Sequence, residues 1–150
     1  MATGDFTLFD EFKREEGEEI HQLAADTLKF GVITATVTPA AGDTTPRWAD
    51  YSGNEVSTGT SYTTGGITLT HTWTEAAGTV TFQITSFTAA QDASTGFTNG
   101  AWGIVYNDTA PADQAIGFFE LGTVNLSTGP MTVNFNGAAV GNPGTVFTKS

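Results

Sequence analysis

Cysteine is absent from this chain of 150 residues, and basic residues are scarce. Without cysteine the protein forms no disulfide and offers no thiolate for metal binding or nucleophilic attack. Only five Lys and Arg stand against 16 Asp and Glu, which gives a formal net charge of −11. Because nucleic-acid affinity rests on Lys and Arg contacts to phosphates, this balance argues against nucleic acid as a partner, and equally against an anionic membrane.

Long apolar runs are also missing, and no stretch is apolar for long enough to span a bilayer. The first residues, "MATGDFTLFDEF", are acidic and lack the basic region and continuous apolar core of a secretory signal peptide. We therefore expect synthesis in the cytosol. A protein of this kind that is found outside a cell is expected to leave as part of an assembly built within.

Histidines are few as well, since the chain has only two, and no serine has the glycine-flanked pattern of a nucleophile elbow. His71 alternates with Leu69 and Trp73, which favours a core or half-buried histidine over a general base. His21 follows an acidic segment and is expected to pack or to cap a helix. We expect no enzymatic activity and no cofactor.

Two other chemistries stay open beside the ordinary interpretation of these residues as turn formers. Asp108 and Glu120 form a candidate carboxylate pair for glycoside hydrolysis, which needs a defined separation in a cleft. Asn107, Asp108 and Asp113 place oxygen ligands for Ca²⁺ in one loop, although their spacing fits no EF-hand. We expect no metal site.

Glycine, phenylalanine and threonine are abundant. The 18 Gly, 11 Phe and only 14% charged residues are typical of many short strands joined by tight turns. Alternating apolar residues predict a first strand in residues 27–37, hairpins over residues 66–87 and 101–122, and further strands near residues 124–137 and 146–147. The expected fold is mainly β, a β-sandwich of jelly-roll type with an N-terminal helix or arm.

The N-terminal segment is the only helix-like part, and it is predicted as a helix over residues 7–24. Half of the 16 carboxylates lie in residues 5–26. We therefore expect residues 1–26 to be a helix or mobile arm that docks on a basic protein surface, beside a β-sandwich domain in residues 27–150. Deletion of this arm is expected to leave the β-domain folded.

Residues 38–66 contain prolines, glycines and polar residues with little periodicity, so they are expected to run as a long loop over the surface. Such loops are often functional. Trp48 and Tyr51 lie in this loop and are candidates to dock a partner or a sugar.

Four blocks of sequence resemble, in this order, a group of small structural proteins of tailed bacteriophages. The blocks are "FKREEGEEIHQLAADTLKFGVIT", "SYTTGGITLT", "WGIVYNDTAPADQAIGFFELG" and "LSTGPMTVNF". They match the group's helix and entry to the first strand, its Tyr-Thr-x-Gly-Gly block and its Tyr-Asn-Asp-Thr hairpin. The chain departs from the group at "HQL", where Gln22 replaces the usual Asn, and in its more acidic helix.

The resemblance implies a virion structural protein, and by analogy of size and fold a capsid decoration, or cement, protein on the outer surface of the capsid. Its expected partner is the major capsid protein, and it is expected to be a homo-oligomer, trimer or dimer, at capsid symmetry axes. The alternative is a head-fibre or tail-associated module that binds a receptor or glycan. The candidate contact residues are Phe9, Phe12, Glu15, Glu16, Glu18, Glu19, Trp48 and Tyr51.

Overall fold

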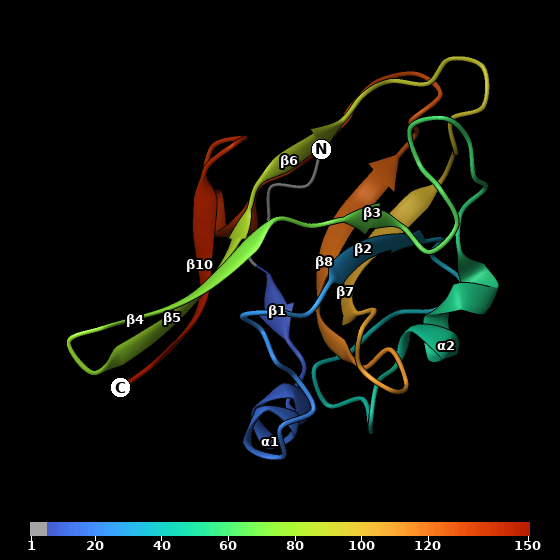
Figure 1. Cartoon of the computed structure of the whole chain (residues 1–150). Helices are drawn as coiled ribbons and strands as arrows, with labels where there is room; N and C mark the ends of the chain where they lie inside the picture. Colours follow the sequence, from blue (N-terminus) through green and yellow to red (C-terminus); the bar gives the residue numbers. More distant parts are fainter. Residues whose placement is uncertain (1–5) are drawn as a thin grey trace.

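The structure is a computed structural model that describes residues 6–150, and it is mainly β, as predicted (Figure 1). Its helical segments are short: α1 (Glu11–Gly17), α2 (Trp48–Tyr51), η1 (Ser52–Asn54) and η2 (Phe135–Gly137). The strands are β1 (Thr7–Leu8), β2 (Leu28–Ile33), β3 (Ile67–Thr68), β4 (His71–Ala76), β5 (Thr79–Thr85), β6 (Phe87–Ala89), β7 (Gly100–Asn107), β8 (Ala115–Val124), β9 (Met131–Val133) and β10 (Pro143–Lys149).

The strands form three antiparallel sheets in the part of the chain that the structure describes. Their orders are β1-β8-β7-β2-β3, β10-β5-β4 and β6-β9. Both predicted hairpins are confirmed, as β4–β5 and β7–β8. The turn between β4 and β5 consists of Ala77 and Gly78, whose φ angles of 51° and 81° match the right-handed twist of a two-residue hairpin.

One face of the five-stranded sheet builds the main core. Phe30 of β2 is fully buried, and its ring centroid lies 5.3 Å from that of Phe87 in β6 and 6.5 Å from that of Phe135 in η2. Gly103 of β7 leaves the room for Phe30, because a Cβ there would lie 2.0 Å from the phenyl ring. The core therefore joins the five-stranded sheet to the β6–β9 pair and η2.

The opposite face of the same sheet is also covered, by the segment expected to be a surface loop. Trp48 stacks on Tyr106 of β7 with a centroid distance of 4.8 Å and an interplanar angle of 2°. Gly31 permits this, since a Cβ there would lie 2.3 Å from the indole ring. Trp48 and Tyr51 are 8% and 3% exposed. The prediction that they are free to dock a partner or sugar is therefore wrong, because they bury the second face of the sheet.

Tyr51 is fixed by polar contacts as well as by packing. Its hydroxyl donates to a carboxylate oxygen of Asp43 at 2.8 Å. Burial raises the pKa of Tyr51, and the hydrogen bond to Asp43 raises it further. The Tyr51 side chain therefore helps to fix the conformation of residues 38–66.

The N-terminal segment is part of the core, which corrects the expectation that Phe9 and Phe12 belong to an arm that docks on a partner. Phe9 and Phe12 are both fully buried. Phe9 packs on Phe118 of β8 at 5.1 Å, and Phe12 packs on Phe82 and Phe147 of the three-stranded sheet at 6.4 and 5.6 Å. Residues 1–5 of the predicted arm lie outside the described residues.

The helix is also shorter than predicted, because α1 ends at Gly17. Glu19 then takes a positive φ of 61°, a conformation that no continuing α-helix adopts. The reversal brings His21 into the interior, where it is 6% exposed.

A carboxylate ties two other loops together. Asp92 accepts hydrogen bonds from the Thr95 hydroxyl at 2.6 Å, from the Thr95 N–H at 2.9 Å and from the Thr60 N–H at 2.9 Å. These bonds, that of the Thr95 hydroxyl first, hold the pKa of Asp92 well below its usual range. The loop before β3 is thereby fixed to the loop before β7.

Truncation of Phe12 to Ala is expected to lower the free energy of unfolding by about 3–5 kcal/mol, because it removes a buried ring from the contact between α1 and the three-stranded sheet. Val140→Ala is the control, since that side chain is 49% exposed and should cost under about 0.5 kcal/mol. Urea unfolding followed by circular dichroism measures both.

A chain beginning at residue 26 should lose cooperative unfolding, because it lacks Phe9 and Phe12. A truncated chain that melts as sharply as the full chain would contradict the placement of the N-terminal segment in the core.

Asp92→Asn should lower the melting temperature near neutral pH and have less effect in acid. A carboxylate whose pKa is depressed in the folded state stabilises the fold above its unfolded pKa of about 3.9, and this contribution is lost as pH falls toward the folded value. The difference in melting temperature between wild type and variant should therefore shrink below about pH 4. Glu120→Gln, at an exposed position, is the control. A pH-independent difference would mean that the charge of Asp92 plays no part.

Candidate functional site

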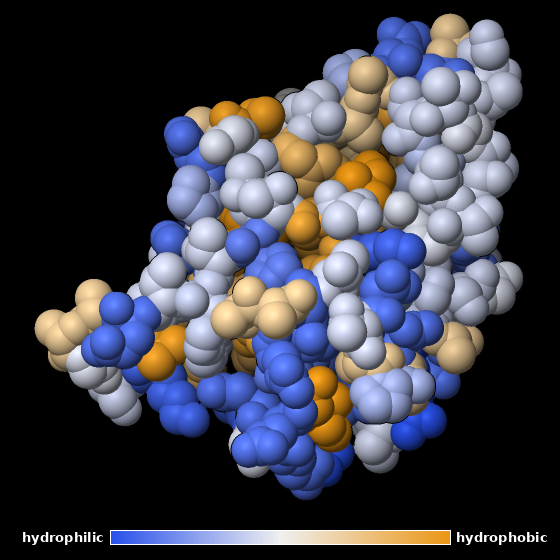
Figure 2. Space-filling model, in the orientation of Figure 1, coloured by the Kyte–Doolittle hydropathy of each residue, from blue (hydrophilic) through white to orange (hydrophobic). Residues whose placement is uncertain are grey.

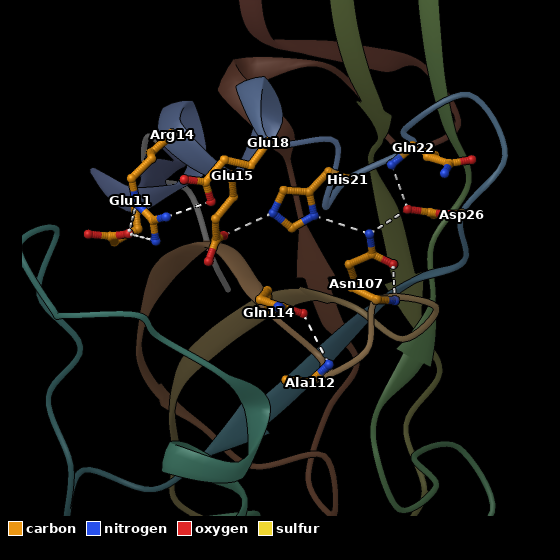
Figure 3. Close-up of polar contacts among 11 residues, drawn as sticks. Glu11, Arg14, Glu15, Glu18, His21, Gln22, Asp26, Asn107, Ala112 and Gln114 are labelled. Carbon is orange, nitrogen blue, oxygen red and sulfur yellow. Dashed lines mark hydrogen bonds and ion pairs between the residues drawn. The ribbon is translucent and has the colours of Figure 1, made fainter.

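A chain of buried polar side chains joins the N-terminal segment to the end of β7 (Figure 3). Glu15 and His21 are 2% and 6% exposed, Asp26 is 9% exposed and Asn107 is fully buried. Glu15 Oε2 lies 3.1 Å from His21 Nε2, and His21 Nδ1 lies 3.1 Å from Asn107 Nδ2. Asn107 Nδ2 also donates to Asp26 Oδ2 at 2.6 Å. We refer to these four residues as the buried polar chain.

The orientation of the Asn107 amide determines which ring nitrogen of His21 carries the proton. Asn107 Oδ1 accepts the backbone N–H groups of Thr109 and Ala110, at 3.0 and 3.1 Å, so its Nδ2 must face the histidine. An amide nitrogen only donates, hence His21 Nδ1 has to accept and carries no proton. The ring proton is then on Nε2 and is donated to Glu15.

This arrangement is structural and leaves no nitrogen of His21 for proton transfer, because both ring nitrogens are engaged. Asn107 is the last residue of β7, and its N–H donates to the Gln114 carbonyl at 2.9 Å, so the ordinary interpretation of Asn107 and Asp108 as residues of a turn is confirmed. The buried polar chain thus fastens the segment after α1 onto the hairpin loop between β7 and β8.

His71 is half-buried in β4, as predicted. Its Nε2 bonds to the backbone carbonyl of Leu23 at 2.9 Å, which ties β4 to the same N-terminal segment. Its Nδ1 is buried and has no hydrogen-bond partner among residues 6–150. With one ring nitrogen bonded to the backbone and the other shielded from solvent, His71 serves to hold the loop after His21 against β4.

The loop oxygens considered for Ca²⁺ are largely committed to other contacts. Asn107 Oδ1 accepts two backbone N–H groups, and Asp108 forms an ion pair with Lys29 at 3.2 Å. Burial, followed by the charge of Asp108, raises the pKa of Asp113. Within residues 6–150 there is no group of three or more His, Cys, Asp or Glu side chains placed to hold a metal ion.

The carboxylate pair considered for glycoside hydrolysis is far apart. Glu120 is paired with Trp102 in the β7–β8 ladder, and Asp108 follows the other end of β7. Six residues of extended chain span about 20 Å, whereas glycosidases hold their carboxyl groups within about 10 Å of each other. The ladder therefore separates this pair.

The eight predicted contact residues do not lie on one surface. Five of them are buried, because Glu15 belongs to the buried polar chain and the four aromatic residues pack on the sheets. Glu16 is half-buried, and Glu18 and Glu19 are exposed. Figure 2 shows the hydrophilic side chains gathered over α1. The structure thus reduces the predicted contact set to Glu16, Glu18 and Glu19.

Most basic side chains are paired with carboxylates. Arg14 forms ion pairs with Glu11 and, at 2.6 Å, with Glu18. Lys149 lies 3.5 Å from Glu16, and Lys29 pairs with Asp108 as described above. Three of the five basic residues are therefore paired, and Glu16 and Glu18 are among their partners, whereas the exposed Glu19 forms no ion pair among the described residues.

A surface pocket of about 270 Å³ opens beside these glutamates. Trp73 of β4 forms one wall, and Glu16 of α1 together with the loop after α1 forms the rest. We call it the α1–β4 pocket; its lining consists of Glu16, His21, Gln22, Leu23, Ala24, Ala25 and Trp73. Sequence patterns did not reveal it, because its walls come from segments some 50 residues apart.

None of the helices in residues 6–150 is both long and apolar enough to cross a membrane. Comparison of the chain with protein-family models, with curated proteins and with solved structures finds no match.

Asn107→Ala is expected to destabilise the protein by at least about 2 kcal/mol, since it leaves His21, Asp26 and two backbone N–H groups short of a buried partner, at about 1–3 kcal/mol for such a group. The control is Asn125→Ala, which loses one exposed hydrogen bond from the Asn99 N–H. Denaturant unfolding gives both free energies, and nitrogen chemical shifts of the ring report the Nε2-protonated form of His21. Equal costs for the two variants would exclude a central role for Asn107.

Proposed function

We propose that this protein is a non-enzymatic structural protein of a tailed-bacteriophage particle. It decorates the outside of the assembled capsid, binds the major capsid protein and stabilises the head. The observation that carries the proposal is the excess of carboxylates around α1: Glu18 and Glu19 are exposed there, and Glu11, Glu16, Glu18 and Glu19 outnumber the two basic residues of α1, Lys13 and Arg14. We propose a phage particle because four blocks of the sequence resemble phage structural proteins.

The acidic surface supports a protein partner of opposite charge. Complementary charges increase the rate of encounter and select the partner, and they do so without a catalytic group. The polar side chains of the interior are engaged in holding the fold, as the buried polar chain and Asp92 illustrate. Interior polar side chains that stabilise the fold and surface carboxylates that are free to contact a partner are what we expect of a protein that acts by binding.

The proposal includes the arrangement of the protein on the particle. It is made in the host cytoplasm and attaches to the assembled lattice as a homo-oligomer, a dimer or trimer, at symmetry axes. Several identical contacts around such an axis add, so each of them can be weak.

The proposal also includes a β-sandwich of jelly-roll type. Its support is the packing of the five-stranded sheet, through Phe30, against Phe87 and Phe135 in the β6–β9 layer. An experimental structure in which these layers do not face each other would contradict it.

Particles that lack this protein are expected to rupture at a lower temperature than decorated ones, because a ligand that binds only the assembled shell stabilises it in proportion to occupancy. Purified protein added back should restore the rupture temperature. The measurement is a melting curve of particles followed by the access of a DNA-binding dye. The number of copies per particle, on the order of hundreds for a lattice protein, is counted in the same samples. Identical curves at full occupancy would contradict the proposal.

The charge contribution is tested with two double variants of equal charge. Glu18→Gln/Glu19→Gln should weaken attachment and reduce its dependence on salt, because screening acts on exposed charges. Asp50→Asn/Glu120→Gln removes two exposed carboxylates away from α1 and should behave as wild type. Equal loss of attachment in both variants would indicate that net charge, and not the surface around α1, matters.

A further inference from the structure

The strand β4 lies at the edge of the three-stranded sheet, where its only neighbour is β5. The β4–β5 hairpin extends away from the five-stranded sheet (Figure 1). An edge strand presents unpaired N–H and C=O groups that can pair with another chain, and proteins commonly protect such edges with Lys, Pro or a covering segment. The sequence of β4, HTWTEA, contains neither Lys nor Pro.

The register identifies the backbone groups that β4 leaves free. Across the start of this ladder the Thr85 N–H donates to the Thr70 carbonyl at 2.8 Å. Hydrogen-bonded and non-hydrogen-bonded pairs alternate in an antiparallel ladder. The N–H and C=O groups of His71, Trp73 and Glu75 therefore point away from β5, and no other backbone group of residues 6–150 bonds to them.

The α1–β4 pocket lies beside this free edge. Trp73 belongs to β4 and also lines the pocket, whose other apolar lining residues are Leu23 and the exposed Ala24 and Ala25. Side chains of an added strand alternate between the two faces of the sheet. A side chain of the added strand that lies on the same face as Trp73 is therefore on the side of the sheet where the pocket opens.

Charge decides what kind of strand fits. Glu16 lines the pocket and lies 3.5 Å from Lys149, and Glu75 is exposed on β4. At the end of α1, Glu18 pairs with Arg14, and Glu19 is exposed and forms no ion pair among the described residues. A second copy of this chain would bring the same carboxylates and a net charge of −11 to the contact, and like charges at such a contact are unfavourable. A segment that carries Lys or Arg is complementary.

We propose that the free edge of β4 binds an extended basic segment of another protein. The segment pairs antiparallel or parallel with His71, Trp73 and Glu75, becomes the fourth strand of the β10-β5-β4 sheet, and inserts one apolar side chain into the α1–β4 pocket. Main-chain hydrogen bonds hold the segment, and the pocket and glutamates select it. This interaction goes beyond capsid decoration, since it is a property of the isolated chain.

The test uses the purified full-length protein and a synthetic ten-residue peptide of alternating lysine and valine. Binding should slow hydrogen exchange at the amides of His71, Trp73 and Glu75 by at least about ten-fold and should change the fluorescence of Trp73. It should weaken markedly at high salt. The same peptide with N-methyl groups along one edge cannot pair with β4 and should not bind, nor should a peptide of alternating glutamate and valine.

Matched variants separate the edge from the charge and the pocket. Glu75→Gln and Glu75→Pro remove the same charge, but only the proline removes an outward N–H, so it should weaken binding at least about ten-fold more. Ala24→Leu fills the pocket and should weaken binding, whereas Ala35→Leu, at another exposed alanine, should not. Circular dichroism and melting curves establish that each variant is folded.

Three results would overturn the proposal: equal binding of the acidic peptide, protection outside β4, or self-association through β4 in place of peptide binding. Because no particle is present, these results are independent of the rupture assay. A protein that stabilises particles but ignores the peptide refutes the edge interaction alone. One that binds the peptide but leaves rupture unchanged refutes decoration alone.

Discussion

The five-stranded sheet has to be buried on both faces, and most of the other features follow from this constraint. In β7 and β8 side chains on either face are apolar, so neither face can be left in water. One face is covered by the layer that contains Phe87 and Phe135. The other requires a second cover, which the chain provides with Trp48, Tyr51 and the N-terminal Phe9.

Residues 38–66 and the N-terminal segment have little regular structure of their own, but both are essential parts of the core. A short segment can cover the second face only with large side chains. Trp48 does so, because its ring stacks on Tyr106 and lies over Gly31, which has no side chain. Once Phe9 and Phe12 are committed to opposite sides of the fold, α1 is fixed between them. The buried polar chain then secures the return of the chain toward β2, where Asp26 also accepts the Gln22 N–H at 2.7 Å.

The sequence predicted those features that depend on local patterns. Alternation identified both hairpins, and within β7 the alternating Trp102, Ile104 and Tyr106 share one face of the sheet. Alternation does not reveal whether an apolar stripe covers the chain's own sheet or a partner, because both uses bury the same residues. The apolar stripe around Phe9 and Phe12 was misassigned for that reason.

The polar part of the site was beyond local patterns as well. Asn107 lies 86 residues from His21 and 81 from Asp26, so only the completed fold brings them together. The sequence did place His21 and His71 in packed surroundings, which the structure confirms. It also placed eight carboxylates near the N-terminus, but it could not separate Glu15, which is buried against a histidine, from Glu18 and Glu19, which face solvent.

The side chains available for binding a partner are those that the core does not bury. Val140, at 49%, is the only exposed large hydrophobic side chain among residues 6–150, so these residues offer few large apolar side chains to an interface. In the interaction that we propose, recognition relies on charge and on backbone hydrogen bonds. Both occur together where α1 meets β4: carboxylates outnumber basic residues in and just after α1, and the adjacent strand has the free edge. An acidic surface without an edge would attract many partners and orient none, whereas an edge without charge would pair with its own copies. Their coincidence favours one orientation of one kind of partner.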